Sequence, residues 1–360
     1  MVTTASHDAT VAAARRAAAT ATDTTDLLVT TAAAVRRAVP HAAAAWLTTD
    51  PASGMFSHGH VEAFDAETCE PWFHAELVVD DVHKFSAIGD GRARLVSRLD
   101  DDERAGSWRW SQLMRPQGLD DELRIACRDG AATWATVELH REVGDPDFDT
   151  TVTALLQDVA PHLAAGVRRL SVVERADRAR EPDAPGVVVV HPDGSITALT
   201  DAGARWSELL VPPSGSDRHT PVLAVAESAR AVARGSRSAV EARVRTRTVD
   251  GAWVTLHAQP AVVEAEDVVV VVEPSQPAEI AMLLSHAYGL TTREHEVVLG
   301  LSRGSSTKQL AAELFLSPHT VRDHVKAAMA KVGVSSRGEL VAALFERHYA
   351  PELFARVTTR

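Results

Sequence analysis

Four helix-start signals follow one another between residues 289 and 345, and they constrain the fold more than any other feature of the chain. At three of them a serine or threonine precedes a glutamate or glutamine by three residues, which is the spacing of a capping box. The pairs are Thr291 and Glu294, Ser306 and Gln309, and Ser336 and Glu339. The fourth signal is Ser317 with a proline after it, and Gly333 marks the end of that helix. The spacing therefore predicts a small all-α domain of four short helices.

The third of these helices along the chain, which begins at Ser317, has one apolar and one polar face. On a wheel of about 3.6 residues per turn, its apolar side consists of Val321, Val325, Ala328, Met329 and Val332. Two long cationic side chains, Arg322 and Lys326, lie one turn apart on the opposite side. The short link over residues 315–318 predicts a helix-turn-helix arrangement with the second helix. Because the major groove of DNA admits a helix and presents base edges to arginine and lysine, this face predicts DNA binding.

Three stretches of this segment also match a known pattern in order. They are LTTREHEVV over residues 290–298, GSSTKQLA over 304–311 and LSPHTVRDHVK over 316–326, followed by Lys331, Ser336 and Arg337. Together they resemble the LuxR-type DNA-binding domain, also called NarL/FixJ-type. The resemblance implies double-stranded operator DNA as a partner, with RNA polymerase as a further candidate. It also implies a homodimer formed through the fourth helix, where Val341, Leu344 and Phe345 would supply apolar surface.

The resemblance assigns roles to individual side chains. It implies that Arg322, Asp323 and Lys326 face the groove, and that Thr320, His324, Lys331 and Arg337 contact the DNA backbone or support the helix. Ser317 joins them because free amides at a helix start bind phosphate, and Thr307 and Lys308 complete the set of DNA-binding candidates. Phosphate repels an acidic side chain, so Asp323 would accept from a cytosine amino group or hold Arg322.

Charge and cysteine content limit the remaining possibilities. The net charge of −12 argues against a chain that coats nucleic acid along its whole length, whereas residues 289–345 carry seven basic and five acidic side chains. Two cysteines, Cys69 and Cys127, cannot build a disulfide framework or a four-thiolate zinc site. The longest aliphatic run, residues 268–272, is too short to cross a membrane, and no secretory signal is recognisable. We expect a cytoplasmic protein.

Two proline-containing polar stretches, residues 180–186 and 274–279, divide the chain into three folded units. The predicted order is a flexible tail over residues 1–22, a first domain over 23–178, a linker over 179–185, a second domain over 186–275, a linker over 276–288, the helix-turn-helix domain over 289–347 and a tail over 348–360. In the first domain, periodicity predicts helices over 26–39 and 150–170 and strands over 42–47 and on both sides of a hairpin at Asp129 and Gly130. In the second it predicts a small antiparallel sheet with helices on one side.

The first two domains also resemble known families. Residues 116–124, the hairpin, Trp134, residues 139–141 and the long helix up to Leu170 are similar to GAF-type sensor domains fused to LuxR-type regulators in actinobacteria. Residues 186–273, with HPDG at the first hairpin, resemble a PAS domain. The fold class is then multidomain α+β, with GAF-like and PAS-like α/β sensor units before the all-α domain. Both resemblances imply an internal pocket, which binds either a small-molecule effector or no ligand at all.

Large aromatic and polar side chains of the first domain are candidates for lining such a pocket. They are Trp72, Phe73, His83, Phe85, Trp108, Trp110, Arg115 and Trp134. A metal site is not predicted, because His58, His60, His74 and His83 lack a ligand spacing with a carboxylate or thiolate. No cofactor is predicted either, and Cys127 lies on the apolar register of a strand, which indicates an inert core thiol. The chain also lacks the phosphate-loop, nucleophile-elbow and zinc-protease motifs, so we do not expect an enzyme.

The function predicted from these patterns is a sequence-specific, DNA-binding transcriptional regulator whose front half senses a small molecule or partner. Two alternatives stay open. One is a phosphorylation-dependent response regulator, which would need an aspartate pocket after a strand that we cannot assemble here. The other is a GAF-domain signalling scaffold whose helices bind protein instead of DNA.

Overall fold

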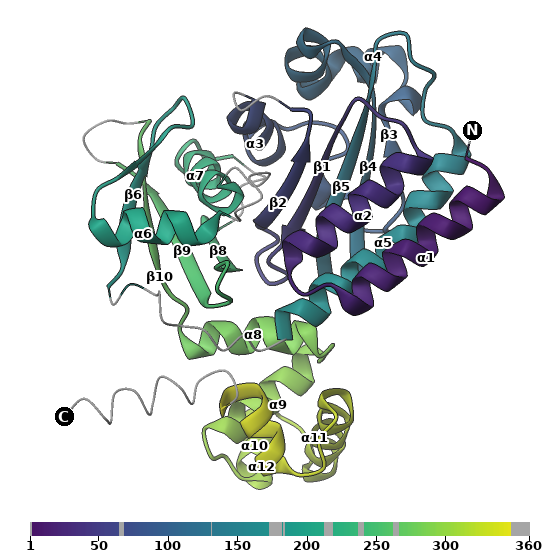
Figure 1. The fold of residues 1–360 in the computed structure, drawn as a ribbon. Helices are drawn as coiled ribbons and strands as arrows, with labels where there is room; N and C mark the ends of the chain where they lie inside the picture. The colour runs from purple at the N-terminus through teal and green to yellow at the C-terminus, as the bar shows by residue number, and fades with distance from the viewer. Residues whose placement is uncertain are drawn as a thin grey trace. The chain divides into compact units, whose positions relative to one another are not determined.

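The computed structural model describes residues 2–64, 68–130, 132–172, 182, 184–211, 219–236, 241–261 and 266–346. Its chain forms two compact units, residues 1–274 and residues 275–360 (Figure 1). The first unit contains two five-stranded antiparallel sheets, and the second is helical. The expected α+β multidomain class is therefore confirmed. No helix among the described residues is long and apolar enough to span a membrane.

The first sheet has the strand order β2-β1-β5-β4-β3. Its strands are β1 Ala43–Thr49, β2 Phe56–Glu62, β3 Arg94–Leu95, β4 Leu119–Asp129 and β5 Ala132–Glu142. The helices around it are α1 Thr4–Thr20, α2 Thr24–Ala38, α3 Cys69–Leu77, α4 Asp101–Gly106 and α5 Thr150–Val172. Figure 1 shows α1, α2 and α5 stacked together beside this sheet. The predicted helices and strands and the hairpin at Gly130, whose φ is +61°, are confirmed.

The N-terminal segment is helical, so the prediction of a flexible tail over residues 1–22 is wrong. Alanine is the best helix former, and the Oγ1 of Thr3 caps the start of α1 by accepting the Ser6 N–H at 3.2 Å. Ala14 and Ala17 are buried. Arg169 on α5 donates to the carbonyl groups at the end of this segment, at 2.6 and 2.7 Å. The alanines thus allow α1 to pack closely against its neighbours.

The segment between β2 and β4 has little regular structure, which explains why its sequence is hard to interpret. Besides α3 and α4 it contains single turns over Phe85–Ala87, Val96–Arg98 and Arg115–Gln117. A π-helical turn covers Arg109–Met114. Such turns are too short to contain a repeating pattern of apolar residues, so the sequence does not reveal them.

The second sheet has the strand order β7-β6-β10-β9-β8. It comprises β6 Gly186–Val190, β7 Ile196–Ala198, β8 Arg243–Arg247, β9 Trp253–Pro260 and β10 Val268–Pro274, with α6 Asp201–Leu210 and α7 Thr220–Ala233. The predicted small antiparallel sheet is confirmed. Every residue of α7 from Thr220 to Ala231 is buried. This helix packs against its own sheet and also against α3 and β2, so one apolar core continues through both sheets.

The second unit contains α8 Pro277–Ala287, α9 Thr292–Ser302, α10 Thr307–Glu313, α11 Pro318–Val332 and α12 Arg337–Val341, followed by a π-helical turn over Ala342–Glu346. The four predicted helices are confirmed, and so are their N-caps. The predicted capping box of Ser336 and Glu339 is only half formed, because Glu339 Oε2 accepts the Ser335 N–H instead of that of Ser336. The residues predicted as a linker, 276–288, form α8 instead. Proline is favoured in the first turn of a helix, and the side chains of Ile280 and Leu283 are buried.

Candidate nucleic-acid interface and internal cavity

Local hydrogen bonds define both ends of α11. The Oγ of Ser317 accepts the Thr320 N–H at 3.1 Å and also contacts Thr320 Oγ1 at 2.9 Å. Pro318 follows as the first helical residue, where its missing N–H costs nothing. Gly333 ends the helix with φ at +74°, a conformation that suits glycine. Because local contacts fix both ends of α11, the start and the end of this helix are well defined.

The apolar side of α11 packs inside the second unit. Val321, Val325 and Ala328 are buried, and Met329 and Val332 are half-buried. This helix packs against α9 and α10. The predicted core face is therefore confirmed, and the polar side is left facing outward.

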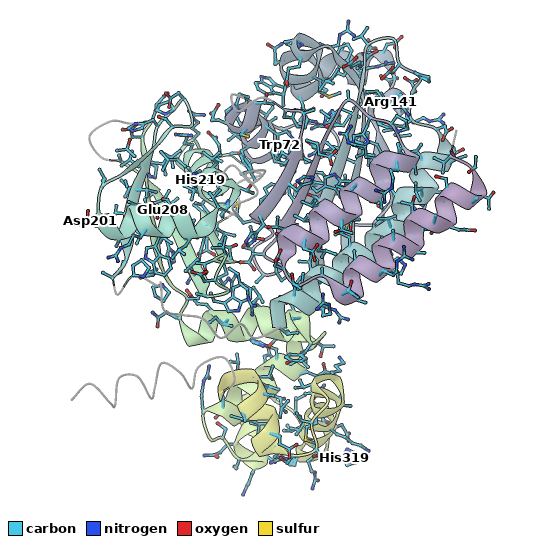
Figure 2. All side chains as sticks on the ribbon, viewed as in Figure 1. Trp72, Arg141, Asp201, Glu208, His219 and His319 are labelled. Atoms are coloured by element: carbon cyan, nitrogen blue, oxygen red, sulfur yellow. The ribbon has the colours of Figure 1, made fainter. Side chains whose placement is uncertain are left out.

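The outward side of α11 presents two long cations. Arg322 and Lys326 are exposed, and neither forms a hydrogen bond or ion pair with any residue that the structure describes. The carboxylate of Asp323 instead faces His319, with Oδ2 at 2.8 Å from Nδ1 (His319 is labelled in Figure 2). Of the two roles considered for Asp323, holding Arg322 is therefore not seen here. Both cations are available to a polyanion.

The turn before α11 is tight and exposed. Phe315 has φ at +55° and is 95% exposed. The Leu316 N–H donates to the Ala311 carbonyl at 2.8 Å, which closes the turn. Gly300 on α9 brings α10 close, because a Cβ at that position would lie 2.0 Å from Leu310 Cδ2. These contacts set the arrangement of α9, α10 and α11.

Three of the predicted DNA-binding residues, Lys331, Arg337 and Thr307, join helices within the unit. Lys331 Nζ donates to Glu294 Oε2 at 2.6 Å and so joins α11 to α9. Burial raises the pKa of Glu294, but the hydrogen bond and charge of Lys331 together with the hydrogen bonds to Thr291 outweigh it, so the pKa lies below its usual range. Arg337 Nη2 donates to Thr307 Oγ1 at 2.9 Å and joins α12 to α10. Lys331, Arg337 and Thr307 thus hold the helices of this unit against one another.

The other predicted residues of this set lie near α11 or at its edge. Lys308 and Ser317 are exposed, whereas Thr320 and His324 are half-buried.

The fourth helix offers less apolar surface for a dimer contact than expected. Leu344 is buried and Val341 half-buried, because α8 packs against the turn over Ala342–Glu346. The side chain of Phe345 lies outside the described residues.

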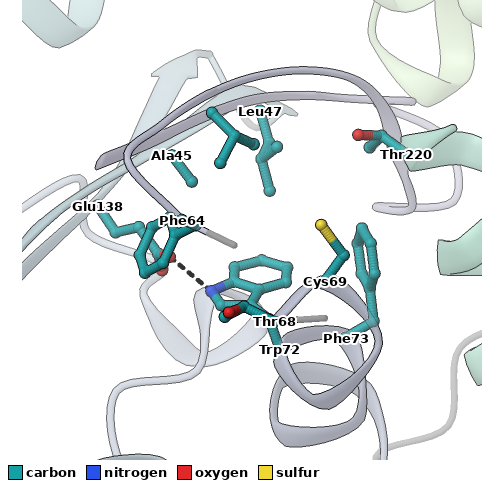
Figure 3. A pocket seen from close by; sticks show the side chains of 10 residues that line it. Ala45, Leu47, Phe64, Thr68, Cys69, Trp72, Phe73, Glu138 and Thr220 are labelled. Carbon is teal, nitrogen blue, oxygen red and sulfur yellow. Dashed lines mark hydrogen bonds between the residues drawn. The ribbon is translucent and has the colours of Figure 1, made fainter. Parts of the chain in front are cut away.

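A small internal cavity lies in the first unit, between the first sheet, α3 and the start of α7 (Figure 3). Its lining is mostly apolar: Ala45, Leu47, Val61, Phe64, Thr68, Cys69, Trp72, Phe73, Glu138 and Thr220. The Trp72 indole N–H donates to Glu138 Oε1 at 2.5 Å, so that carboxylate is fixed at the cavity wall. An apolar pocket with a few polar groups, here Glu138, Thr68 and Thr220, is typical of a site for a small organic molecule.

The structure brings two of the eight pocket candidates, Trp72 and Phe73, into this cavity. The other six lie elsewhere: Phe85 beneath the Arg124 guanidinium, Trp108 against the His74 ring, Trp110 and Arg115 against each other, Trp134 in the core, and His83 half-buried on a turn. Trp108 immediately precedes the π-helical turn over Arg109–Met114, and Trp110 is the second residue of that turn. Cys127 is buried, and this burial raises the pKa of its thiol.

The four histidines considered as metal ligands have different partners. His58 contacts Thr246, His60 contacts Glu62, His74 contacts Glu227, and the carbonyl of His83 accepts from Arg124. The sequence reasoning missed a different set, the buried charges Glu122, Arg124, Glu138 and His140 on β4 and β5. Its only signal is the alternation of charged residues at every second position of two facing strands.

Comparison with known proteins gives one family match. Residues 289–344 match the family described as "Bacterial regulatory proteins, luxR family". The spore germination protein GerE of Bacillus subtilis is 47% identical over 55 residues, which cover 15% of this chain and 74% of that protein. The transcriptional regulatory protein UhpA of Escherichia coli is 46% identical over 57 residues, or 16% of this chain and 29% of that protein.

The front half has matches among solved structures that are too remote to identify it. The GAF domain/HD domain protein from Geobacter sulfurreducens is 15% identical, covers 43% of this chain and 99% of that chain, and superposes with a TM-score of 0.32. A TM-score of this size does not establish a shared fold. What is known of the front half is therefore its own topology of two antiparallel sheets.

Proposed function

The chain belongs to the LuxR family of bacterial regulatory proteins, and we propose that it is a sequence-specific transcriptional regulator that inserts α11 into the major groove of its operator. The observation that carries this proposal is the pair Arg322 and Lys326, exposed and without partners among the described residues, on the outer side of a helix whose inner side is packed. Arginine and lysine in that position can donate to guanine O6 and N7. Of the relatives named above, UhpA is a transcriptional regulatory protein and GerE is a spore germination protein.

The front half supports a sensing role. We infer that its two GAF-like and PAS-like modules respond to a small molecule or a partner, and that the cavity beside Trp72 is the place for a small ligand. Thr220 at the start of α7 lines this cavity, and α7 packs against both sheets. A ligand that changed the position of α7 would therefore affect both modules. Such a signal acts only if the ligand binds one arrangement more tightly than another.

The phosphorylation-dependent alternative is less well supported. Receiver-type domains have a doubly wound parallel sheet, whereas both sheets in the described part of this chain are antiparallel.

We also propose a homodimer on a two-fold operator, as LuxR-type domains imply. The burial of Leu344 means that Val341 and residues outside the described set would have to supply more of the contact.

Selection of binding sites from random-sequence DNA by the full chain tests the proposal. Lys326→Ala should weaken binding to the selected site by about 1–3 kcal/mol and relax its sequence preference. Arg293→Ala is the matched control, because Arg293 is an exposed cation of the same unit that pairs with Glu296 on α9. If no sequence is enriched, or if both variants bind like the parent, α11 is not the reading helix. The scaffold alternative would then be favoured.

A further inference from the structure

Three ligand-type side chains meet on one face of the first sheet. Glu122 on β4 lies directly opposite His140 on β5, and Glu138 precedes His140 by two residues, so all three point to the same side. Their exposed fractions are 0%, 2% and 0%, respectively for Glu122, His140 and Glu138. His140 Nε2 is 3.4 Å from Glu138 Oε1 and 4.0 Å from Glu122 Oε1. One donor atom of each lies within 4.8 Å of the other two.

The ion-pair network around these residues has more negative than positive groups. It joins four carboxylates and two guanidiniums: Glu76, Asp81, Glu122, Glu138, Arg109 and Arg124. Arg109 donates to Glu122, and Arg124 donates to Glu76. The buried Lys84 donates to the Val79 carbonyl and forms no ion pair with the described members of this network. With His140 neutral, the carboxylates still outnumber the buried cations by one when Lys84, which interacts electrostatically with Glu76 and Asp81, is counted. The region excludes water, so unpaired charge there is costly.

His140 provides an independent indication of a missing ligand. Neither Nδ1 nor Nε2 has a hydrogen-bond partner among the described residues, and the ring is buried with its centroid 5.1 Å from that of the Phe64 ring. Oε2 of Glu138 also lacks a hydrogen bond there. Leaving a buried polar atom unpaired is costly, because the atom has lost its hydrogen bonds to water. A cation bound between His140 Nε2 and the carboxylates would give Nε2 and the Glu138 carboxylate a partner.

We propose that Glu122, Glu138 and His140 bind one divalent transition-metal ion. An ion held at about 2.0–2.2 Å by nitrogen and oxygen donors places those donors up to ~4 Å apart, which fits the two distances from His140. Carboxylate and imidazole ligands together favour Zn²⁺, Mn²⁺ or Fe²⁺. Trp72 and Arg109, which donate to Glu138 and Glu122, would orient the carboxylates as outer partners.

The metal site adjoins the cavity through Glu138, which lines it. Three protein ligands leave at least one coordination position open. A small molecule in the cavity could then be recognised partly by the metal. Binding of the ion does not depend on the proposed function, whereas an effect of the ion on DNA affinity rests on it. Metal binding is therefore measured without DNA.

The test uses the full chain, treated with EDTA, dialysed and titrated with ZnCl₂ and separately with MnCl₂ by isothermal calorimetry. We expect one equivalent of at least one ion to bind, and we expect His140→Gln and Glu138→Gln each to weaken this binding at least tenfold. His257→Gln is the matched control, because His257 Nε2 faces a single carboxylate, Glu273 Oε1, at 3.5 Å and is half-buried. This variant should bind like the parent.

A second measurement does not require a buried substitution to fold. X-ray absorption of the metal-loaded parent should show only nitrogen and oxygen neighbours, including one imidazole. Sulfur neighbours would overturn the proposal, and so would the absence of stoichiometric binding by both ions. Unchanged binding in folded His140→Gln and Glu138→Gln would also overturn it. If the metal-free parent binds no ion and NMR shows His140 as an imidazolium, a proton balances the network and the proposal is wrong.

Discussion

Gly203→Ala offers a direct test of how closely α6 packs against β6. A Cβ at residue 203 would lie 2.4 Å from the carbonyl oxygen of Val187 and 3.0 Å from its backbone carbon and nitrogen. Non-bonded carbon atoms need about 3.5 Å or more. The obstacle is main chain, which cannot rotate away as a side chain can, so α6 has to shift outward. Overpacking of this kind costs about 1–3 kcal/mol, while replacing glycine by alanine in a helix gains up to about 1 kcal/mol. We expect a net loss of about 1–2 kcal/mol.

Hydrogen exchange of the full chain, followed by mass spectrometry of peptides from residues 186–210, measures the local free energy of opening. Gly106→Ala is the matched control in the same unit, because Gly106 ends the helix α4 and nothing lies within 4 Å of the position that an added methyl group would take. That variant should be neutral or slightly more stable. The reasoning is refuted if these peptides exchange hydrogen as slowly in Gly203→Ala as they do in the parent protein.

Three further predictions concern the first unit. Burial and the neighbouring Glu227 carboxylate raise the pKa of Glu70 to about 7 from its ordinary value of 4.5, so the folded state retains a proton that the unfolded state loses. Stability should therefore fall as pH rises from about 4.5 to 7, and Glu70→Gln should remove that part of the slope in urea midpoints measured against pH. Arg245 Nε donates to Asp50 Oδ2 at 2.8 Å in a buried pair, so Arg245→Met should cost about 3–5 kcal/mol in urea unfolding. Asp50 also accepts from Ala52 N–H, Ser53 Oγ and Arg245 N–H, so adding Asp50→Asn, which removes the charge and keeps an acceptor oxygen, should recover part of this loss; equal stability of the single and double variants would contradict this. The raised pKa and burial of Cys127 predict that iodoacetamide at pH 8 alkylates this thiol only in denaturant, and rapid labelling of the native protein would show the opposite.

Local signals made the DNA-binding region predictable. Each helix start between residues 289 and 345 depends on a side chain within three residues, and the structure has each of these caps. The same locality places Arg322 and Lys326 on one side of α11, because both belong to one helix. A helix in the N-terminal segment was missed because its sequence is rich in alanine and threonine, with little apolar periodicity to mark a buried side.

The cavity and the charge network could not be predicted in this way. Their members come from β1, α3, β4, β5, α7 and a π-helical turn, which are far apart in the sequence. Eight pocket residues were predicted from their aromatic or polar side chains alone, yet the fold brings only Trp72 and Phe73 of these to the cavity. Glu138 and His140 were not considered, because a charged residue on an alternating strand usually faces solvent, whereas α3 and the turns after it cover this side.

The central claim is that the outer face of α11 reads base edges in the major groove. Methylation interference on the selected operator tests it most directly, because dimethyl sulfate modifies guanine N7 in the major groove and adenine N3 in the minor groove. We predict that N7 methylation at specific guanines blocks the parent protein, and that Arg322→Ala loses sensitivity at one of them. Interference confined to adenine N3, or no interference at any guanine, would contradict the claim.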